Sequence, residues 1–133
     1  MSLHKVKVQA LAFSPDDATI GQPRFLASLG GQDDNSLVLW DVATGQALCG
    51  SPTSNDFTLN LRYFARSPMH MITCGNYNLC VWEYDEVNNK LRPHPVNLGS
   101  LSRVFLSVTV DDTDTFAYVG SKTGEGRWWE IGV

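Results

Sequence analysis

Three short runs in this chain end in a tryptophan that is followed by an acidic residue. They read LVLWD at 37–41, LCVWE at 79–83 and RWWE at 127–130. Trp82 follows Trp40 by 42 residues, and Trp129 follows Trp82 by 47. A motif that returns every ~40–45 residues indicates a supersecondary unit that buries its apolar faces only by stacking on further copies. This spacing limits the chain to repeat architectures.

Between the tryptophans, β-prone runs alternate with turn residues, and helical periodicity is nearly absent. The turns 14–17 (SPDD) and 111–114 (DDTD) carry short side chains that bond back to the backbone, and Gly45 and Gly124 stand where a turn needs positive φ. We expect strands at Val6–Phe13, Arg24–Leu29, Ser36–Val42, Ala47–Cys49, Thr58–Ala65, His70–Cys74, Leu79–Tyr84, Leu91–Val96, Arg103–Val110, Thr115–Gly120 and Arg127–Ile131.

The repeats share an internal layout. Tyr63 lies 19 residues before Trp82, and Val110 lies 19 before Trp129. The first repeat is longer by a segment at 18–23 (ATIGQP), whose Gly and Pro disfavour a continuous strand, so we expect a surface loop there. Each unit is a strand, an acidic turn, a second strand, another turn and a third strand that ends in Trp-acid. Four short strands in ~40–45 residues are typical of a propeller blade.

Composition narrows the function classes. At 133 residues the chain is one domain's worth or less, and its net charge of −4 argues against a nucleic-acid surface. No apolar run approaches the ~18 residues of a membrane span. Three cysteines without a framework pattern favour a reducing compartment. We therefore expect an intracellular protein of the cytoplasm, with no nucleic acid and no membrane as partner.

With its Trp-acid pairs, the chain resembles WD40-repeat proteins. In that family the tryptophan packs between blades, and its N–H joins a buried chain formed with a Ser, an Asp and a His. Carried over by position, the resemblance implies His4, Asp34 and Trp40 in repeat one, with Gln32 in the Ser position. In repeat two it implies Trp82, with Cys74 and Asn76 in the Ser and Asp positions; in repeat three, Ser121 and Trp129, with Thr123 in the Asp position.

A more specific resemblance is carried by the runs LAFSPDD, FLASLGGQDDNSLVLWD, VWEYD and VDDTDTFAYVGSKTG. These are similar to the cilia- and flagella-associated protein 52 family, which is much longer and forms two propellers. The segment 18–23 and the sequence around Trp128 and Trp129 depart from that family, which is compatible with a truncated or alternatively spliced product.

The resemblance implies an all-β fold: a WD40 β-propeller segment of about three four-stranded blades, with repeats at roughly 4–50, 51–97 and 98–133. Closed propellers typically need 4–8 blades, so we expect an incomplete ring whose partners include further WD40 blades. The family sits inside the doublet microtubules of motile cilia. The expected function is that of a non-enzymatic microtubule inner protein in the axoneme, with tubulin and other inner proteins as partners. The alternative is a generic WD40 scaffold in a soluble intracellular complex.

The remaining clusters of acidic residues, histidine and cysteine have structural explanations. Asp111, Asp112 and Asp114 lack the spacing of a calcium loop, so we interpret them as a solvated turn. Asp33 and Asp34 could act as an acid–base pair, but the repeat position already explains Asp34. His70, Cys74 and Cys80 lack the close cysteine pairs of zinc sites and are expected to pack in the core. We therefore predict no catalytic, cofactor or metal site.

The adjacent tryptophans need different surroundings. Neighbouring strand residues point to opposite faces of a sheet, so if Trp129 takes the repeat's packing position, Trp128 faces the other side. There it meets a neighbouring blade or an external partner, and Arg127 and Trp128 are the residues that we expect to contact such a partner.

Overall fold

The computed structural model describes residues 8–30, 35–53, 58–98, 103–124 and 126–131. Within these ranges every regular element is a β-strand, and no helix could cross a membrane. The strands are β1 (Val8–Phe13), β2 (Asp16–Asp17), β3 (Gln22–Pro23), β4 (Phe25–Gly30), β5 (Ser36–Asp41), β6 (Ala47–Pro52), β7 (Thr58–Tyr63), β8 (His70–Gly75), β9 (Asn78–Asp85), β10 (Lys90–Pro95), β11 (Phe105–Val110), β12 (Phe116–Ser121) and β13 (Gly126–Glu130).

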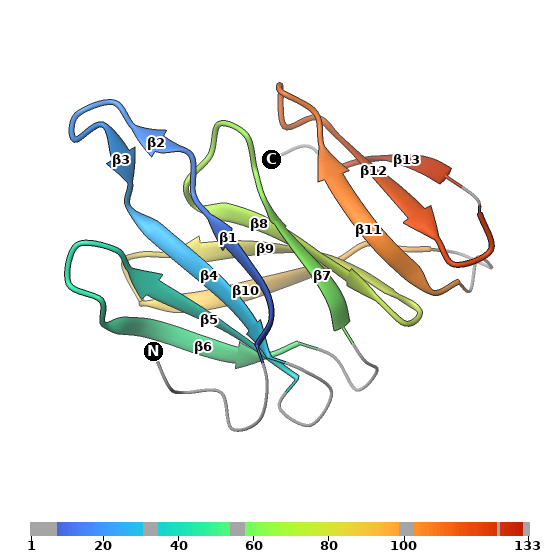
Figure 1. The fold of residues 1–133 in the computed structure, drawn as a ribbon, viewed down its shortest axis with the longest axis horizontal. Helices are drawn as coiled ribbons and strands as arrows, with labels where there is room; N and C mark the ends of the chain where they lie inside the picture. Colours follow the sequence, from blue (N-terminus) through green and yellow to red (C-terminus); the bar gives the residue numbers. More distant parts are fainter. Residues whose placement is uncertain (1–7, 31–34, 54–57, 99–102, 125, 132–133) are drawn as a thin grey trace.

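Three antiparallel sheets stand one after another along the molecule (Figure 1). Blade one has the order β1-β4-β5-β6, blade two β7-β8-β9-β10, and blade three β11-β12-β13. The first strands of the blades are neighbours, because β7 contacts both β1 and β11. The third blade has three strands within the described residues, one fewer than the prediction for each blade.

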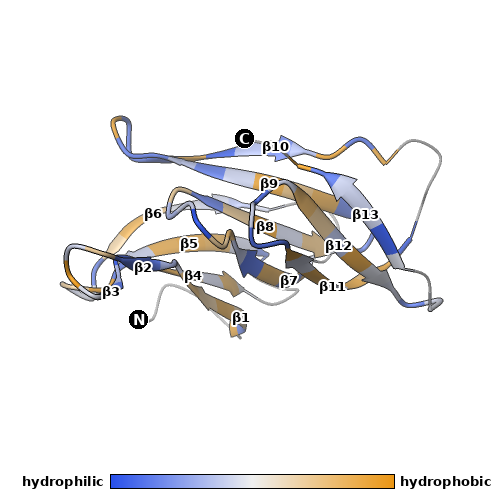
Figure 2. Cartoon of the chain, turned by 90° about the horizontal axis from the view of Figure 1, so that it is seen from above, coloured by the Kyte–Doolittle hydropathy of each residue, from blue (hydrophilic) through white to orange (hydrophobic). Residues whose placement is uncertain are grey.

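The core lies between the blades rather than inside any one of them. One apolar cluster joins blades one and two and includes Leu29, Leu39, Met71 and Trp82. A second cluster joins blades two and three. In Figure 2 the hydrophobic colour follows strands such as β5, whereas β10 at the rim is mainly hydrophilic. Each sheet is thus stabilised by its neighbours, as the repeat spacing predicted.

The predicted strands are confirmed with small shifts at their ends, since the predicted Ser36–Val42 is β5 and the predicted Leu79–Tyr84 is β9. Gly45 and Gly124 have φ of 72° and 89°, so both turns use the left-handed conformation that was expected of them. The segment 18–23 lies at the surface between β1 and β4, as predicted, although its last two residues form β3. The sequence did not reveal that β2 and β3 pair at its base, with Asp17 opposite Gln22.

Candidate functional site: the tryptophan positions and the faces between blades

Trp40 is held by its own sheet. It lies opposite Leu26 across β4 and β5, and its indole N–H donates to Ser28 Oγ at 2.8 Å. Trp40 is 4% exposed, while Asp41 beside it is partly exposed, as the repeat pattern predicts. A buried indole N–H needs a hydrogen-bond acceptor, and Ser28 supplies it for Trp40. Sequence reasoning missed Ser28, since the segment 31–34 lengthens the connection between β4 and β5.

Trp82 repeats the arrangement in blade two. It lies opposite Met71, and its indole N–H donates to Thr73 Oγ1 at 3.0 Å. The assignment of Cys74 to the Ser position is therefore wrong by one residue. A shift of one residue moves a side chain to the other face of the sheet. Cys74 accordingly faces blade three, where its thiol lies 3.6 Å from the Phe105 carbonyl oxygen.

Blade three breaks the pattern. Ala117 lies opposite Trp129 and Val119 opposite Arg127, so the position that Ser28 and Thr73 hold in the other blades belongs here to Val119, which has no acceptor. Trp129 is half-buried and packs edge-on against Phe105, with ring centroids 5.9 Å apart.

The assignment of Ser121 to the Ser position is also wrong, because it lies two residues beyond Val119 and its Oγ contacts Thr123 Oγ1 at 3.0 Å. Asn76, given the Asp position in repeat two, instead forms an isolated backbone bridge with Val104. His4, Gln32 and Asp34 lie outside the described residues, as does Asp33. The buried chain of Ser, Asp and His stays a prediction.

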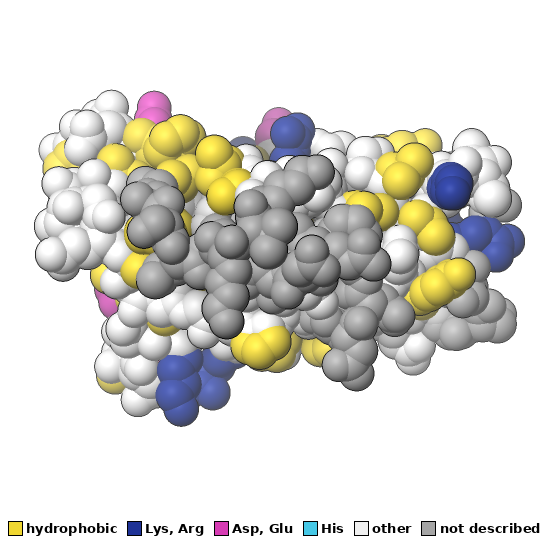
Figure 3. Space-filling view, turned by 60° about the horizontal axis from the view of Figure 1, so that its bottom comes forward, with side chains coloured by type: hydrophobic (Ala, Val, Ile, Leu, Met, Phe, Trp, Pro, Cys, Tyr) yellow, Lys and Arg dark blue, Asp and Glu magenta, His cyan; other side chains and the backbone are white. Residues whose placement is uncertain are grey.

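The three repeated tryptophans share one direction. Trp82 faces blade one and Trp129 faces blade two, while Trp40 lies with Leu26 and Val38 on the outer face of blade one. Trp128 turns to the opposite side, as strand alternation predicts, and is 60% exposed on the outer face of blade three. Figure 3 shows hydrophobic side chains reaching the surface toward both ends of the long axis.

Asp114 of blade three forms hydrogen bonds to blade two. It is 7% exposed, and its carboxylate accepts backbone N–H groups of Ala65, Arg66 and Ser67 at 2.6, 2.9 and 3.2 Å. In addition, Arg66 Nε donates to the Asp112 carbonyl oxygen at 2.6 Å. The interpretation of 111–114 as a solvated turn is therefore wrong for Asp114. A buried carboxylate is retained because N–H donors replace the water that it loses.

A cleft of about 930 Å³ opens between blades two and three beside β13. Glu83 lies in it between two imidazoles, with His70 Nε2 at 3.9 Å and His94 Nε2 at 3.6 Å. Burial lowers the pKa of His70; Glu83 opposes this shift, His94 reinforces it, and Asp114 opposes it. His70 Nδ1 also lies 2.7 Å from Ser67 Oγ. Among the described residues no group of three or more His, Cys, Asp or Glu has the geometry of a metal site.

Packing in the core is confirmed for Cys74 and Cys80, whereas His70 is only partly buried and lines the cleft between blades two and three. Cys74 and Cys80 belong to the clusters on opposite faces of blade two. Burial raises the pKa of Cys74 to about 12 and that of Cys80 to about 11, so both thiols stay protonated at neutral pH.

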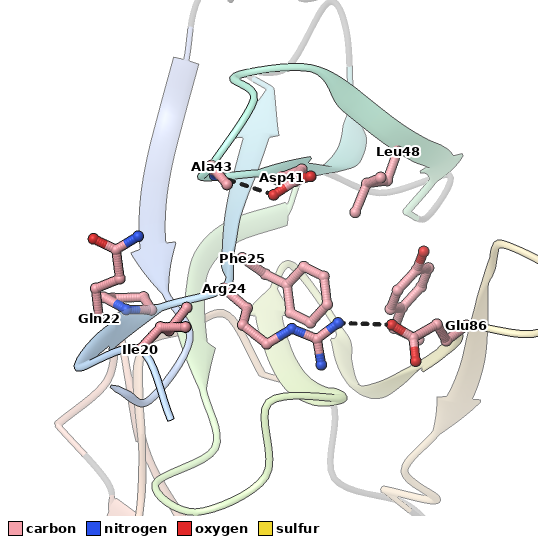
Figure 4. A pocket seen from close by; sticks show the side chains of 10 residues that line it. Ile20, Gln22, Arg24, Phe25, Asp41, Ala43, Leu48 and Glu86 are labelled. Atoms are coloured by element: carbon pink, nitrogen blue, oxygen red, sulfur yellow. Dashed lines mark hydrogen bonds and ion pairs between the residues drawn. The ribbon is translucent and has the colours of Figure 1, made fainter. Parts of the chain in front are cut away.

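A smaller pocket of about 310 Å³ lies between blades one and two (Figure 4). Arg24 crosses it to Glu86 at 2.9 Å, with its guanidinium 4.8 Å from the centre of the Phe25 ring. On the blade-one side of the pocket, Asp41 Oδ1 accepts the N–H of Ala43. These charged groups already have partners within the protein. We therefore interpret the pocket as part of the contact between blades one and two.

Comparisons with known proteins agree with this geometry. The chain is 59% identical over 125 residues to cilia- and flagella-associated protein 52 of Chlamydomonas reinhardtii and 43% identical over 128 residues to the human protein of the same name, in each case over 94% of the chain. It is 48% identical over 142 residues to mouse WD repeat-containing protein 90. Its fold matches a chain of the mitotic checkpoint complex, with a TM-score of 0.77 at 18% identity.

The chain is a segment of a WD40 β-propeller. It spans about a fifth of the two cilia- and flagella-associated relatives, 19% and 20%, and 7% of the mouse WD-repeat protein. It also covers 39% of the structural neighbour, in line with an open run of blades. No protein-family model matches the sequence.

Proposed function

We propose that this WD40 segment belongs to a non-enzymatic structural protein of motile cilia and flagella, which lies inside axonemal doublet microtubules and binds tubulin and other inner proteins there. The observation that carries the proposal is the 59% identity to the Chlamydomonas cilia- and flagella-associated protein over 94% of the chain. Similarity of this extent reaches all three blades and therefore includes surface residues as well as the core.

The chemistry of the faces supports a binding role. The pocket between blades one and two is bridged by Arg24 and Glu86, and the buried thiols of Cys74 and Cys80 are held protonated. By contrast, large apolar side chains are exposed at both ends of the row of blades, including Phe13 and Trp128 at 59% and 60%. Exposed apolar patches of this kind mark sites that meet other protein.

Fractionation of axonemes tests the proposal. An epitope-tagged chain is expressed in a flagellated cell, and its axonemes are washed with high salt and then treated with a detergent that opens the doublet wall. We expect the chain to resist the salt wash and to leave only with the opened wall, because a luminal protein is enclosed. Complete release by salt would point to the outer microtubule surface. Recovery in the soluble cell body would favour a generic WD40 scaffold.

A matched variant separates binding from folding. Val87 is 94% exposed in the turn between β9 and β10, so Val87→Ser serves as a neutral control. Loss of axonemal retention in Phe13→Ser, with an unchanged thermal midpoint and with retention intact in the control, would link retention to the exposed end face of blade one.

A further inference from the structure

The pocket between blades one and two opens among turns rather than on a face where blades stack. It is lined by Ile20 from the loop with β2 and β3, by Ala43 from the turn between β5 and β6, and by Glu86 from the turn between β9 and β10. These turns lie together on the left of Figure 1. Because blades stack through the faces of their sheets, a further blade on either side would leave this pocket open.

Much of the wall of this pocket is apolar. Phe25 and Tyr84 are buried, and their rings meet edge to face with centroids 5.4 Å apart. Leu48 and Ile20 add aliphatic side chains, and Ile20 is 54% exposed on a turn in which its N–H donates to the Asp17 carbonyl oxygen at 3.1 Å. The volume of about 310 Å³ is at the lower end of the range for small-ligand sites, so the pocket suits one long side chain rather than a folded element.

The contact between the blades leaves carboxylate oxygens over. Glu86 uses Oε2 for Arg24, and Asp41 uses Oδ1 for the N–H of Ala43. The second oxygen of each of these carboxylates has no partner among the described residues. The side chains of Arg24 and Glu86 are 38% and 55% exposed, and exposed ion pairs contribute little to stability. A second cation can therefore share Glu86 at little cost.

Negative charge exceeds positive charge around the pocket. Hydrogen bonds within its own turn lower the pKa of Asp17, and the charge of Arg24 lowers it further. Burial raises the pKa of Tyr84, as do nearby groups that include Glu86 and Asp41, whereas Arg24 lowers it. One cation and three carboxylates thus act on this region. Their sum favours the approach of a cation over that of an anion.

We propose that this pocket, with Leu48 and Tyr84 in its wall and Asp41 and Glu86 at its charged end, binds the lysine side chain of an extended segment of another protein. The ammonium pairs with the two carboxylates, and the alkyl stem packs on the apolar wall. Lysine suits such a site because a compact ammonium with three donors ends a flexible apolar stem. This inference goes beyond the ciliary role and does not depend on it.

Fluorescence anisotropy of a labelled peptide with one lysine among glycines and serines tests the site. The purified chain should bind the peptide saturably, and added salt should weaken the binding. Asp41→Asn keeps an oxygen for the N–H of Ala43, and Glu86→Gln keeps an oxygen for Arg24. Each should weaken binding about twofold to fivefold, because a charge is lost while the local hydrogen bond remains.

A matched control tests whether net charge alone explains the result. Asp112→Asn makes the same change of charge at an exposed turn of blade three, outside the pocket, and should leave the affinity unchanged. A loss as large as that of Asp41→Asn would mean that the peptide follows the overall charge of the chain, and this would overturn the proposal.

Arg24 distinguishes a basic partner from an acidic one. Arg24→Met removes the cation that competes for Glu86, so it should tighten the binding of the lysine peptide about twofold to fivefold. Unchanged or weaker binding by this variant would contradict the proposal, since an acidic partner would instead need the guanidinium.

Two further outcomes would also contradict it. One is equal binding of a peptide with norleucine in place of lysine. The other is equal binding by the parent chain and by the double variant Asp41→Asn with Glu86→Gln, at matched thermal midpoints.

Discussion

Blades two and three are built from the same strand pattern but hold their repeated tryptophans differently. Trp82 is 1% exposed, donates to Thr73 and is enclosed by the cluster that joins blades one and two. Trp129 is half-buried and has Val119 where blade two has a hydroxyl. A repeated tryptophan therefore stabilises the fold fully only where the strand register supplies an acceptor for its N–H and a neighbouring blade covers its ring.

We expect the largest effect of a substitution at the tryptophans themselves. Trp82→Ala should reduce the free energy of unfolding by about 3–5 kcal/mol, because it leaves a large cavity between blades one and two. Trp129→Ala should cost clearly less, since its ring is already partly in water. Urea unfolding of both variants measures this difference. Equal losses would show that the two positions are equivalent.

The attachment of blade three is the next place to test. Asp114→Ala should cost about 2–3 kcal/mol, since three backbone N–H groups of the turn between β7 and β8 lose their charged acceptor. Asp114→Asn should cost less because one oxygen still accepts. Asp112→Ala is the matched control, as Asp112 is exposed and contributes only its carbonyl oxygen to Arg66. Chemical unfolding checks the order of the three variants, and an equal loss in Asp112→Ala would refute the role of Asp114.

The hydroxyl that accepts the indole N–H of Trp82 is absent from the equivalent position of blade three. Thr73→Val makes blade two resemble blade three at this position and should cost about 1–2 kcal/mol, because the indole N–H of Trp82 loses its acceptor. Ser28→Ala should have a similar effect through Trp40. Thr123→Val changes an exposed residue of the turn after β12 and should stay within about 0.5 kcal/mol. A silent Thr73→Val in thermal or urea unfolding would mean that water replaces the hydroxyl.

The smallest effect concerns pH at the face between blades two and three. Burial lowers the pKa of His70 below its ordinary value of 6.5, so the unfolded chain binds a proton more readily there. Stability should therefore fall as pH drops below about 6.5, and the fall should end at the folded pKa. His70→Gln removes the titrating imidazole and should therefore flatten this slope. It leaves in place Glu83, His94 and Asp114, which act on the same imidazole. Thermal midpoints of both proteins from pH 7 to pH 5 measure it, and identical slopes would exclude His70 as the cause.

Local patterns were sufficient for the strands. Alternating β-prone residues and turn residues predicted β5 and β9 within one residue at each end, since side-chain direction in a strand has a period of two and turns favour Gly, Asn and Asp. The same alternation correctly separated the faces of Trp128 and Trp129. Burial of Trp40 and Trp82 also followed from the repeat, although among the described residues only Trp82 is covered by a neighbouring blade.

The partners of these residues were decided by the tertiary structure. Fixed distances along the chain placed the Ser position of the three repeats at Gln32, Cys74 and Ser121, whereas the pairing of neighbouring strands assigns it to Ser28, Thr73 and Val119. Turn length sets that pairing, and a difference of one residue exchanges the two faces of a sheet. The burial of Asp114 depends on backbone N–H groups 47 to 49 residues away, which become neighbours only when blade three packs on blade two. Residue types and their spacing therefore predict where the strands and the tryptophans lie, whereas the packing of the blades sets which groups these residues meet.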